Sequence, residues 1–307
     1  MTSENSKNMS IKDWVLALRL HQWAKNILVF VPLILTNRFY DLETLLTVFI
    51  AFFVFGLVVS ANYLINDFMD LDSDRKHPTK KNRPLASGRL SVRSAVVTIL
   101  LLLGSSLTFI FLLPSIFFGI IALYLFFAIL YSLALKKIVL IDVIVLAGLY
   151  SIRIIAGAFL IKTNPTFWLL AFSMFLFLSL ALIKRYSELK LIKVSSRETD
   201  NNNSIYGRNY ILEDMSILQS IGIGSGLLAV LVFALYINSP EIKMLYKIPE
   251  ALWFALPILL FWITRMWFLT NRGLMHEDPV VFALTDRLSL FSALSMGIIL
   301  WLANTFT

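Results

Sequence analysis

Apolar runs long enough to cross a lipid bilayer recur from one end of this 307-residue chain to the other. A helix needs about 20 mostly apolar residues to span the hydrocarbon core. Only 15% of the residues are charged, whereas soluble domains carry about 25%. The sequence therefore predicts an all-α polytopic membrane protein.

Hydropathy and helix-breaking residues place nine transmembrane helices along the chain. The first is short and contains Pro32, and residues 1–25 before it are expected to form an interfacial segment. Because no linker is evident in the sequence, residues 1–307 are expected to form a single all-helical transmembrane domain. The predicted spans are 26–40, 43–66, 92–113, 115–135, 139–161, 165–184, 211–236, 249–270 and 288–305.

Basic residues are distributed unevenly between the two sides of these spans. Of the 27 Lys and Arg, 22 fall in the N-terminal segment and the loops after alternate spans, while Arg153 lies inside a span. The other side holds Arg38, Lys162, Lys243 and Lys247. Because Lys and Arg accumulate on the cytoplasmic side, we expect an inner-membrane protein with its N-terminus inside and its C-terminus outside. The net charge of +8 is then explained by topology, and nucleic-acid binding is not needed.

The densest charge follows the second predicted span, in YLINDFMDLDSDRKHPTKKNRPLASG. On a continuing helix, Asp70 and Asp74 would lie within about 60° of Asp67, so three carboxylates would share one face. Such carboxylates repel one another unless a cation neutralises them. Mg²⁺ prefers one or two carboxylates together with substrate phosphates. The pattern favours a Mg²⁺-diphosphate site over a solvated run of loop acids, and it assigns Asp67 and Asp70 as metal ligands.

At this motif the chain resembles the UbiA superfamily of intramembrane prenyltransferases. The resemblance rests on NDxxDxxxD (Asn66 to Asp74) and on NRPLASG (Asn82 to Gly88). It implies a nine-helix UbiA-type bundle with Mg²⁺ and a diphosphate bound on the cytoplasmic side. Residues 67–91 and 185–210 would then be the cytoplasmic active-site loops.

Three stretches are similar to the decaprenyl-phosphate phosphoribosyltransferase branch: LRLHQWAKN (Leu18 to Asn26), DRKHPTKKNRPLASG and LIKRYSELKL (Leu182 to Leu191). A second DxxxD motif, which aromatic prenyltransferases carry after the sixth span, is absent. The resemblance implies transfer of 5-phosphoribose from phosphoribosyl diphosphate to a polyprenyl phosphate, for synthesis of cell-envelope polysaccharide precursors. The membrane and these two substrates are the expected partners, and assembly into a homo-oligomer is compatible with this interpretation.

Each candidate residue has an expected role. In the proposed displacement, Asp67 and Asp70 hold the Mg²⁺ that binds the leaving diphosphate. Glu188 is expected to orient a base or to share the metal. Lys184, Arg185 and Tyr186 are expected to hold the 5-phosphate, with Tyr186 hydrogen-bonding the substrate. The expected substrate-binding residues are Lys25, Asn66, Arg75, Lys80, Arg83, Arg153, Lys184 and Arg185, with Asp74 completing the diphosphate cradle.

Plainer interpretations stay open for several of them. Lys184 and Arg185 are also topology determinants, Lys25 could extend toward the interface, and Arg153 could form a structural pair with Asp142. HEDPVVFALTDR (His276 to Arg287) is expected to be a structured loop with a helix cap. Two other functions also remain: an aromatic polyprenyltransferase of the same fold, and a membrane transporter.

Overall fold

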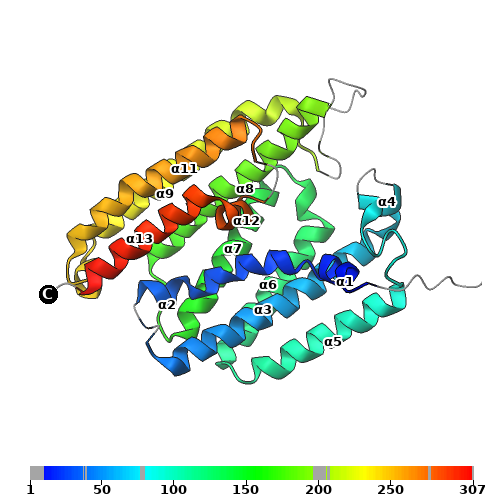
Figure 1. Cartoon of the computed structure of the whole chain (residues 1–307), viewed down its shortest axis with the longest axis horizontal. Helices are drawn as coiled ribbons and strands as arrows, with labels where there is room; N and C mark the ends of the chain where they lie inside the picture. Colours follow the sequence, from blue (N-terminus) through cyan, green and yellow to red (C-terminus); the bar gives the residue numbers. More distant parts are fainter. Residues whose placement is uncertain are drawn as a thin grey trace, which may run out of the picture.

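The computed structural model describes residues 10–36, 38, 40–76, 80–195, 205, 208–275 and 278–305, and within them the chain is helical (Figure 1). The long helices are α3 (Leu42–Met69), α5 (Val92–Ile110), α6 (Ser115–Leu133), α7 (Ile141–Leu160), α8 (Phe167–Ser195), α9 (Met215–Ile237), α11 (Ala255–Asn271) and α13 (Arg287–Thr305). The short helices are α1 (Ile11–Leu18), η1 (Leu20–Phe30), α2 (Val31–Leu35), α4 (Leu71–Lys76), η2 (Lys80–Asn82), η3 (Leu135–Lys137), η4 (Leu212–Asp214), α10 (Pro240–Leu245), η5 (Pro249–Phe254) and α12 (Pro279–Thr285).

Eight helices in the described part of the chain are long and apolar enough to cross a membrane, and a shorter apolar segment spans Leu20–Leu35. The prediction of an all-α polytopic membrane protein is confirmed. Eight of the nine predicted spans correspond to these long helices. The first corresponds to the shorter segment, so the count of nine is approximate.

The first apolar segment begins six residues earlier than predicted and is built differently. It runs as a 3₁₀ helix, η1, and becomes α-helical at α2, where Pro32 lies in the first turn. Pro is tolerated there because the first N–H groups of a helix have no partner within it. Pro32 thus starts a helix instead of interrupting one. Helix α1 is separated from η1 by Arg19, whose φ of 49° is left-handed.

Two helices continue beyond their predicted ends into polar sequence. Helix α3 reaches Met69, so Asp67 belongs to the helix and not to a loop. Helix α8 reaches Ser195, so Arg185, Tyr186 and Glu188 also lie on a helix, although residues 185–210 were expected to form a loop.

Helix α7 holds the bundle together because two hydrophobic clusters meet on it. Its Ile152 and Ala156 pack with η1, α3 and α6, while Ala147 and Ile154 pack with α8, α9 and α11. Gly157 lets η1 approach very closely, since a Cβ at this position would lie 2.1 Å from the carbonyl oxygen of Val29. The N-terminal segment is therefore fixed against the centre of the molecule.

Candidate functional site

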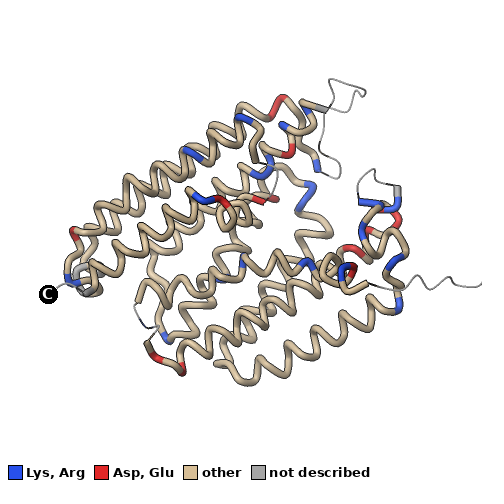
Figure 2. The backbone as a smooth tube through the Cα atoms, viewed as in Figure 1, with Lys and Arg blue, Asp and Glu red and all other residues tan. Residues whose placement is uncertain are grey.

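Charged residues are concentrated at one end of the bundle, around α4 and the ends of α3, α6 and α8 (Figure 2). They surround a polar cavity of about 890 Å³. Three carboxylates line it: Asp67, Asp70 and Asp74. Its cationic residues are Arg19, Lys25, Lys80, Arg83, Lys136, Lys137, Lys184 and Arg208.

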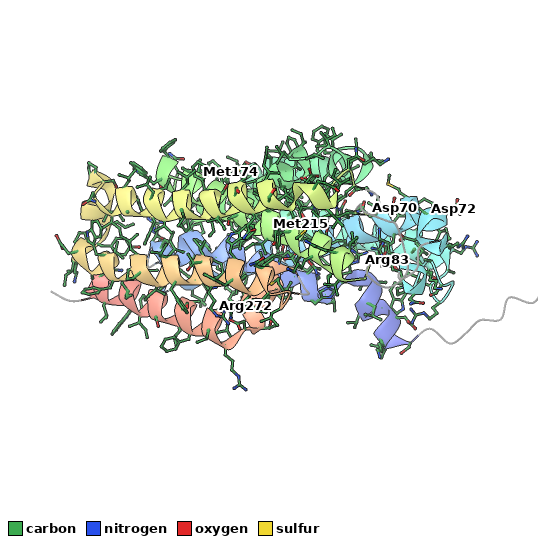
Figure 3. All side chains as sticks on the ribbon, turned by 90° about the horizontal axis from the view of Figure 1, so that it is seen from above. Asp70, Asp72, Arg83, Met174, Met215 and Arg272 are labelled. Carbon is green, nitrogen blue, oxygen red and sulfur yellow. The ribbon has the colours of Figure 1, made fainter. Side chains whose placement is uncertain are left out.

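Two of the three carboxylates are joined by Arg83. Its Nη1 donates to Asp67 at 3.0 Å and to Asp74 at 2.6 Å, and Asp67 also accepts from Arg19 Nη2 at 2.7 Å. Both carboxylates are buried. Asp70 instead turns toward Lys136, whose Nζ donates at 3.1 Å. Figure 3 shows Asp70 and Arg83 at the same end of the molecule as Asp72.

The expectation that the three carboxylates share one face of one helix is wrong in its geometry. Asp70 is the C-cap of α3, with φ −90° and ψ 8°, and Asp74 lies on the separate helix α4. The chain leaves the helix between the first and third acids. Asp67 and Asp74 nevertheless converge, because they share the guanidinium of Arg83.

Among the described residues, no three His, Cys, Asp or Glu side chains form a metal site by themselves. The donor chemistry fits Mg²⁺ bound with a diphosphate, because Asp67 and Asp70 both face the cavity and Mg²⁺ needs only one or two carboxylates when phosphates supply further oxygens. The surrounding cations suit the remaining phosphate charge.

A second charged group is centred on Asp278 and contributes Lys25 and Lys184 to the cavity wall. Asp278 Oδ2 accepts from Lys25 Nζ at 2.7 Å and from Lys184 Nζ at 3.0 Å. Burial alone would raise the pKa of Asp278, but the ammonium groups of Lys184 and Lys25 outweigh burial and hold that pKa well below its usual range. The same side chain caps α12 by accepting from Val280 N–H, which confirms the expected helix cap. His276 and Glu277, which precede Asp278 and could have formed a metal site with it, lie outside the described residues.

Lys25 and Lys184 therefore converge on one carboxylate, and both line the cavity as expected of substrate-binding residues. Asn66, Lys80 and Arg83 line it as well. Burial and the positive charge of Arg83 lower the pKa of Lys80, so an anion beside Lys80 would be favourable.

Four predicted site residues lie elsewhere. Arg185 is fully buried and donates to Asp142 at 2.5 Å and to Glu188 at 2.6 Å, and Glu188 also accepts from Arg208. Tyr186 packs against Trp267 and donates to Asn271 at 2.8 Å. Arg75 is half exposed beside Asp72. Arg185, Tyr186, Glu188 and Arg75 are absent from the described wall of the polar cavity, so their expected contacts with substrate are not supported.

Arg153 lies deeper, in a small inner cavity of about 110 Å³ that adjoins the polar cavity at Lys25, Tyr63 and Asn66. The structural pair with Asp142, the plainer interpretation of Arg153, does not form, because Asp142 is bound by Arg185 and Tyr210. Arg153 instead donates to Asn26 at 3.0 Å and to Tyr124 at 2.9 Å.

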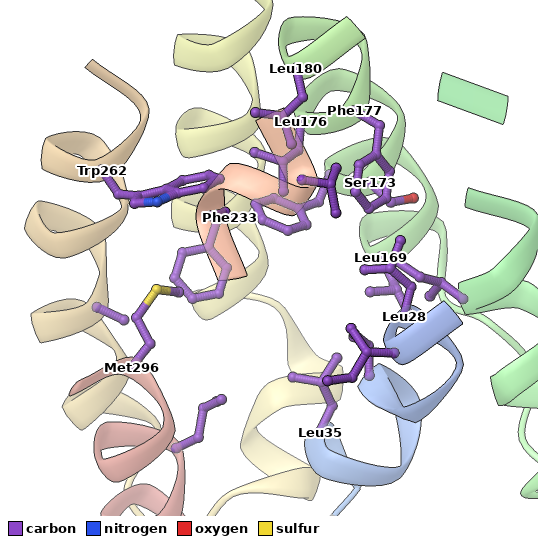
Figure 4. A pocket seen from close by; sticks show the side chains of 18 of the residues that line it. Leu28, Leu35, Leu169, Ser173, Leu176, Phe177, Leu180, Phe233, Trp262 and Met296 are labelled. Carbon is purple, nitrogen blue, oxygen red and sulfur yellow. The ribbon is translucent and has the colours of Figure 1, made fainter. Parts of the chain in front are cut away.

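An apolar pocket of about 340 Å³ is lined in part by α12. Figure 4 shows Phe233, Trp262 and Met296 facing Leu28 and Leu35 across it. Val280 of α12 lines this pocket, two residues after Asp278. Thus α12 lines the apolar pocket, while its N-cap Asp278 binds two lysines that line the charged cavity.

A charged cavity at the end of a bundle of apolar helices, with an apolar pocket beside it, is an arrangement typical of a membrane-embedded enzyme. The UbiA prenyltransferase family model matches residues 27–274, and the chain belongs to this family. It is accordingly a transferase embedded in the membrane by its apolar helices.

Similar sequences carry several names. Over 92% of this chain and 90% of the relative, it is 33% identical to the nodulation protein NoeC of Azorhizobium caulinodans. Over 93% and 90%, it is 29% identical to the decaprenyl-phosphate phosphoribosyltransferase of Mycolicibacterium smegmatis. The uncharacterized protein y4nM of Sinorhizobium fredii is 37% identical over 94% of this chain, which spans 55% of that protein.

Solved structures share the fold. A UbiA homolog from Archaeoglobus fulgidus bound to GPP and Mg²⁺ superimposes with a TM-score of 0.68, covering 96% of this chain and 100% of that one at 16% identity. A structure described for digeranylgeranylglyceryl phosphate synthase gives a TM-score of 0.60 at 19% identity, covering 95% and 96%.

Proposed function

We propose that this transferase moves 5-phosphoribose from 5-phosphoribosyl 1-diphosphate to a polyprenyl phosphate and releases diphosphate. The observation that carries the proposal is the presence of two separate charged groups in one cavity. Asp67, Asp70 and Asp74 line the cavity from the end of α3 and from α4, and the lysine pair held by Asp278 lines it from η1 and α8. A donor with phosphate at both ends of a sugar matches both groups, whereas an allylic prenyl diphosphate gives the lysine pair no partner.

The similarity to decaprenyl-phosphate phosphoribosyltransferases, which extends over most of the chain, supports the same donor. The fold likeness to proteins solved with GPP does not distinguish donors, because it concerns the backbone at 16% identity.

In this proposal Asp67 and Asp70 hold Mg²⁺, which supplies positive charge for the departing diphosphate when bound. Arg83 lies between Asp67 and Asp74 and donates to diphosphate oxygens, and Lys136 assists from the η3 side. The 5-phosphate binds Lys184, Lys25 and Lys80. Arg208 is kept at the cavity wall by Glu188.

The chemical step is a displacement at the anomeric carbon of the ribose. A phosphate oxygen of the lipid forms a bond to that carbon as the bond to the diphosphate oxygen breaks. Because the nucleophile is already an anion, no general base is required. The role of the protein is to position the two reactants and to stabilise the leaving group.

The apolar pocket is proposed to hold part of the polyprenyl chain. Aromatic and aliphatic side chains from η1, α8, α9 and α11 line it, which suits an isoprenoid. Its position beside α12, which Asp278 caps, would bring the lipid phosphate toward the polar cavity.

We further propose that the whole chain acts as one transmembrane catalytic unit in the inner membrane, with the polar cavity facing the cytoplasm. The support is the excess of Lys and Arg at the cavity end of the bundle (Figure 2). A water-soluble donor such as phosphoribosyl diphosphate would enter from that side.

The proposal is tested with purified protein in lipid nanodiscs, given labelled phosphoribosyl diphosphate, polyprenyl phosphate and Mg²⁺. Label should enter the organic phase, and chelation of Mg²⁺ should stop the transfer. Parallel reactions contain geranyl diphosphate with 4-hydroxybenzoate. Prenylation there without transfer from phosphoribosyl diphosphate would show that the donor is wrong while leaving the family unchanged.

A further inference from the structure

The inner cavity is polar, and the cations on its wall already have hydrogen-bond partners. Arg153 donates to Asn26, Tyr124 and the Leu149 carbonyl, which are neutral, so these bonds hold the guanidinium in place without cancelling its charge. The other cation on the wall, Lys25, is bound to Asp278. The charge of Arg153 favours an anionic donor, and the other groups of the wall decide which part of that donor lies here.

The buried side-chain atoms on its described wall that have no hydrogen-bond partner are both acceptors. Asn62 is 8% exposed, and its Oδ1 has no hydrogen-bond partner in the described structure. The Oδ1 of Asn66, which lines both cavities, is likewise unpartnered there. Residues four apart on a helix lie on the same side, so α3 presents two amide oxygens along one wall.

A buried acceptor without a partner is unfavourable, and a hydrogen-bond donor from a ligand would relieve that cost. Phosphate oxygens are acceptors and cannot do this, whereas hydroxyl groups can. Asn66 lines both cavities, so its amide oxygen lies between the inner cavity and the proposed diphosphate site, one helical turn from the amide oxygen of Asn62. A hydroxyl-bearing group attached to a diphosphate would reach them.

We infer that the inner cavity is a sugar-hydroxyl subsite in which Asn62 accepts a hydrogen bond from a ring hydroxyl of the donor. This inference rests on the proposed function and deepens it, because it makes Asn62 a residue that selects a pentose over a chain without hydroxyls. It also sets the orientation of the donor, with the ribose toward the membrane and the diphosphate toward α4.

The test compares three donors at saturating polyprenyl phosphate: phosphoribosyl diphosphate and its analogues lacking the 2-hydroxyl or the 3-hydroxyl. The wild-type protein should use at least one analogue with a kcat/KM lower by roughly tenfold, the effect of one neutral hydrogen bond. In Asn62→Leu, a change of similar size, kcat/KM for the natural donor should fall by about the same factor and the discrimination against that analogue should disappear.

The matched control is Ser151→Ala. Ser151 Oγ is also buried and unpartnered in the described structure, but Ser151 is absent from the wall of the inner cavity, so discrimination should be unchanged. Wild-type protein that transfers from all three donors equally, or Asn62→Leu that keeps the wild-type ratio, would overturn the inference. Absence of any transfer from phosphoribosyl diphosphate would instead overturn the proposed function.

Discussion

Lys184 and Arg185 are neighbours in sequence but lie in different surroundings, because successive residues on a helix point about 100° apart. Lys184 lines the cavity, and Arg185 is enclosed by Asp142, Glu188 and Tyr131. We expect Lys184→Ala to raise the apparent KM for phosphoribosyl diphosphate roughly 10- to 100-fold, the range of a lost charge-assisted hydrogen bond. Stability should change little, since Asp278 keeps Lys25.

Arg185→Ala is the contrasting variant. It leaves Asp142 buried without its cation, and breaking a buried pair costs about 3–5 kcal/mol. The midpoint of thermal unfolding in detergent should therefore fall clearly, whereas in Lys184→Ala it should stay close to wild type. Equal losses of stability in the two variants would contradict this assignment.

Asp67 and Asp72 provide a second comparison between two acids of the same motif. Asp67 is buried in the cavity wall, while the Asp72 side chain is 94% exposed. Asp67→Asn should lower kcat at saturating Mg²⁺ by about 10²- to 10³-fold, the usual cost of removing one electrostatic stabiliser. Asp72→Asn should stay within twofold or so of wild type, measured by label transfer to lipid. Near wild-type turnover of Asp67→Asn would mean that Asp67 is not a metal ligand.

At this scale the sequence predicted the residues that a local pattern marks. Asp67, Asp70 and Asp74 stand out because they follow an apolar span at regular spacing. Asp278 was expected only as a helix cap, because its partners Lys25 and Lys184 lie 253 and 94 residues away in the chain. The hydrogen bonds of Arg185 and Tyr186 could not be predicted for the same reason, since their partners Asp142 and Asn271 are also distant in the chain.

At the scale of elements, the close contact between η1 and α7 should control the position of Lys25. Gly157→Ala would push a methyl group into the carbonyl of Val29, and forced contacts of this kind cost about 1–3 kcal/mol. We expect lower thermal stability together with lower transfer activity, because η1 carries Lys25 into the cavity wall.

The control is Gly148→Ala on the same helix, where nothing lies within 4 Å of the added Cβ. It should be neutral or slightly stabilising, since Ala is favoured over Gly in helices by about 1 kcal/mol. If Gly157→Ala behaves like Gly148→Ala in both assays, then η1 does not depend on this contact.

Helices were predicted well where hydropathy defines them and poorly where they extend into polar sequence. Apolar runs located α5, α6 and α7 to within a few residues. The final turns of α8 were missed because Arg185 and Glu188, which look like loop residues, are bonded inside the bundle. Hydropathy likewise does not distinguish a 3₁₀ helix from an α-helix, which is why η1 was unexpected.

At the scale of the whole molecule, orientation in the membrane follows from the distribution of charge, and the absence of cysteine makes it directly measurable. Three exposed positions are suitable: Lys12, Asn82 and Asn164. Lys12 and Asn82 flank Leu20–Leu35 and Leu42–Met69, while α5, α6 and α7 lie between Asn82 and Asn164.

We therefore expect Lys12→Cys and Asn82→Cys to react with a membrane-impermeant maleimide only in inverted vesicles, and Asn164→Cys only in right-side-out vesicles. The reason is the excess of Lys and Arg on the side of Lys12 and Asn82, which marks the cytoplasm. The cysteine-free wild-type chain supplies the unlabelled background. The reverse pattern would place the polar cavity outside the cell, where the proposed phosphoribosyl donor is not made. Labelling of Lys12→Cys and Asn82→Cys from opposite sides would show instead that Leu20–Leu35 does not cross the membrane.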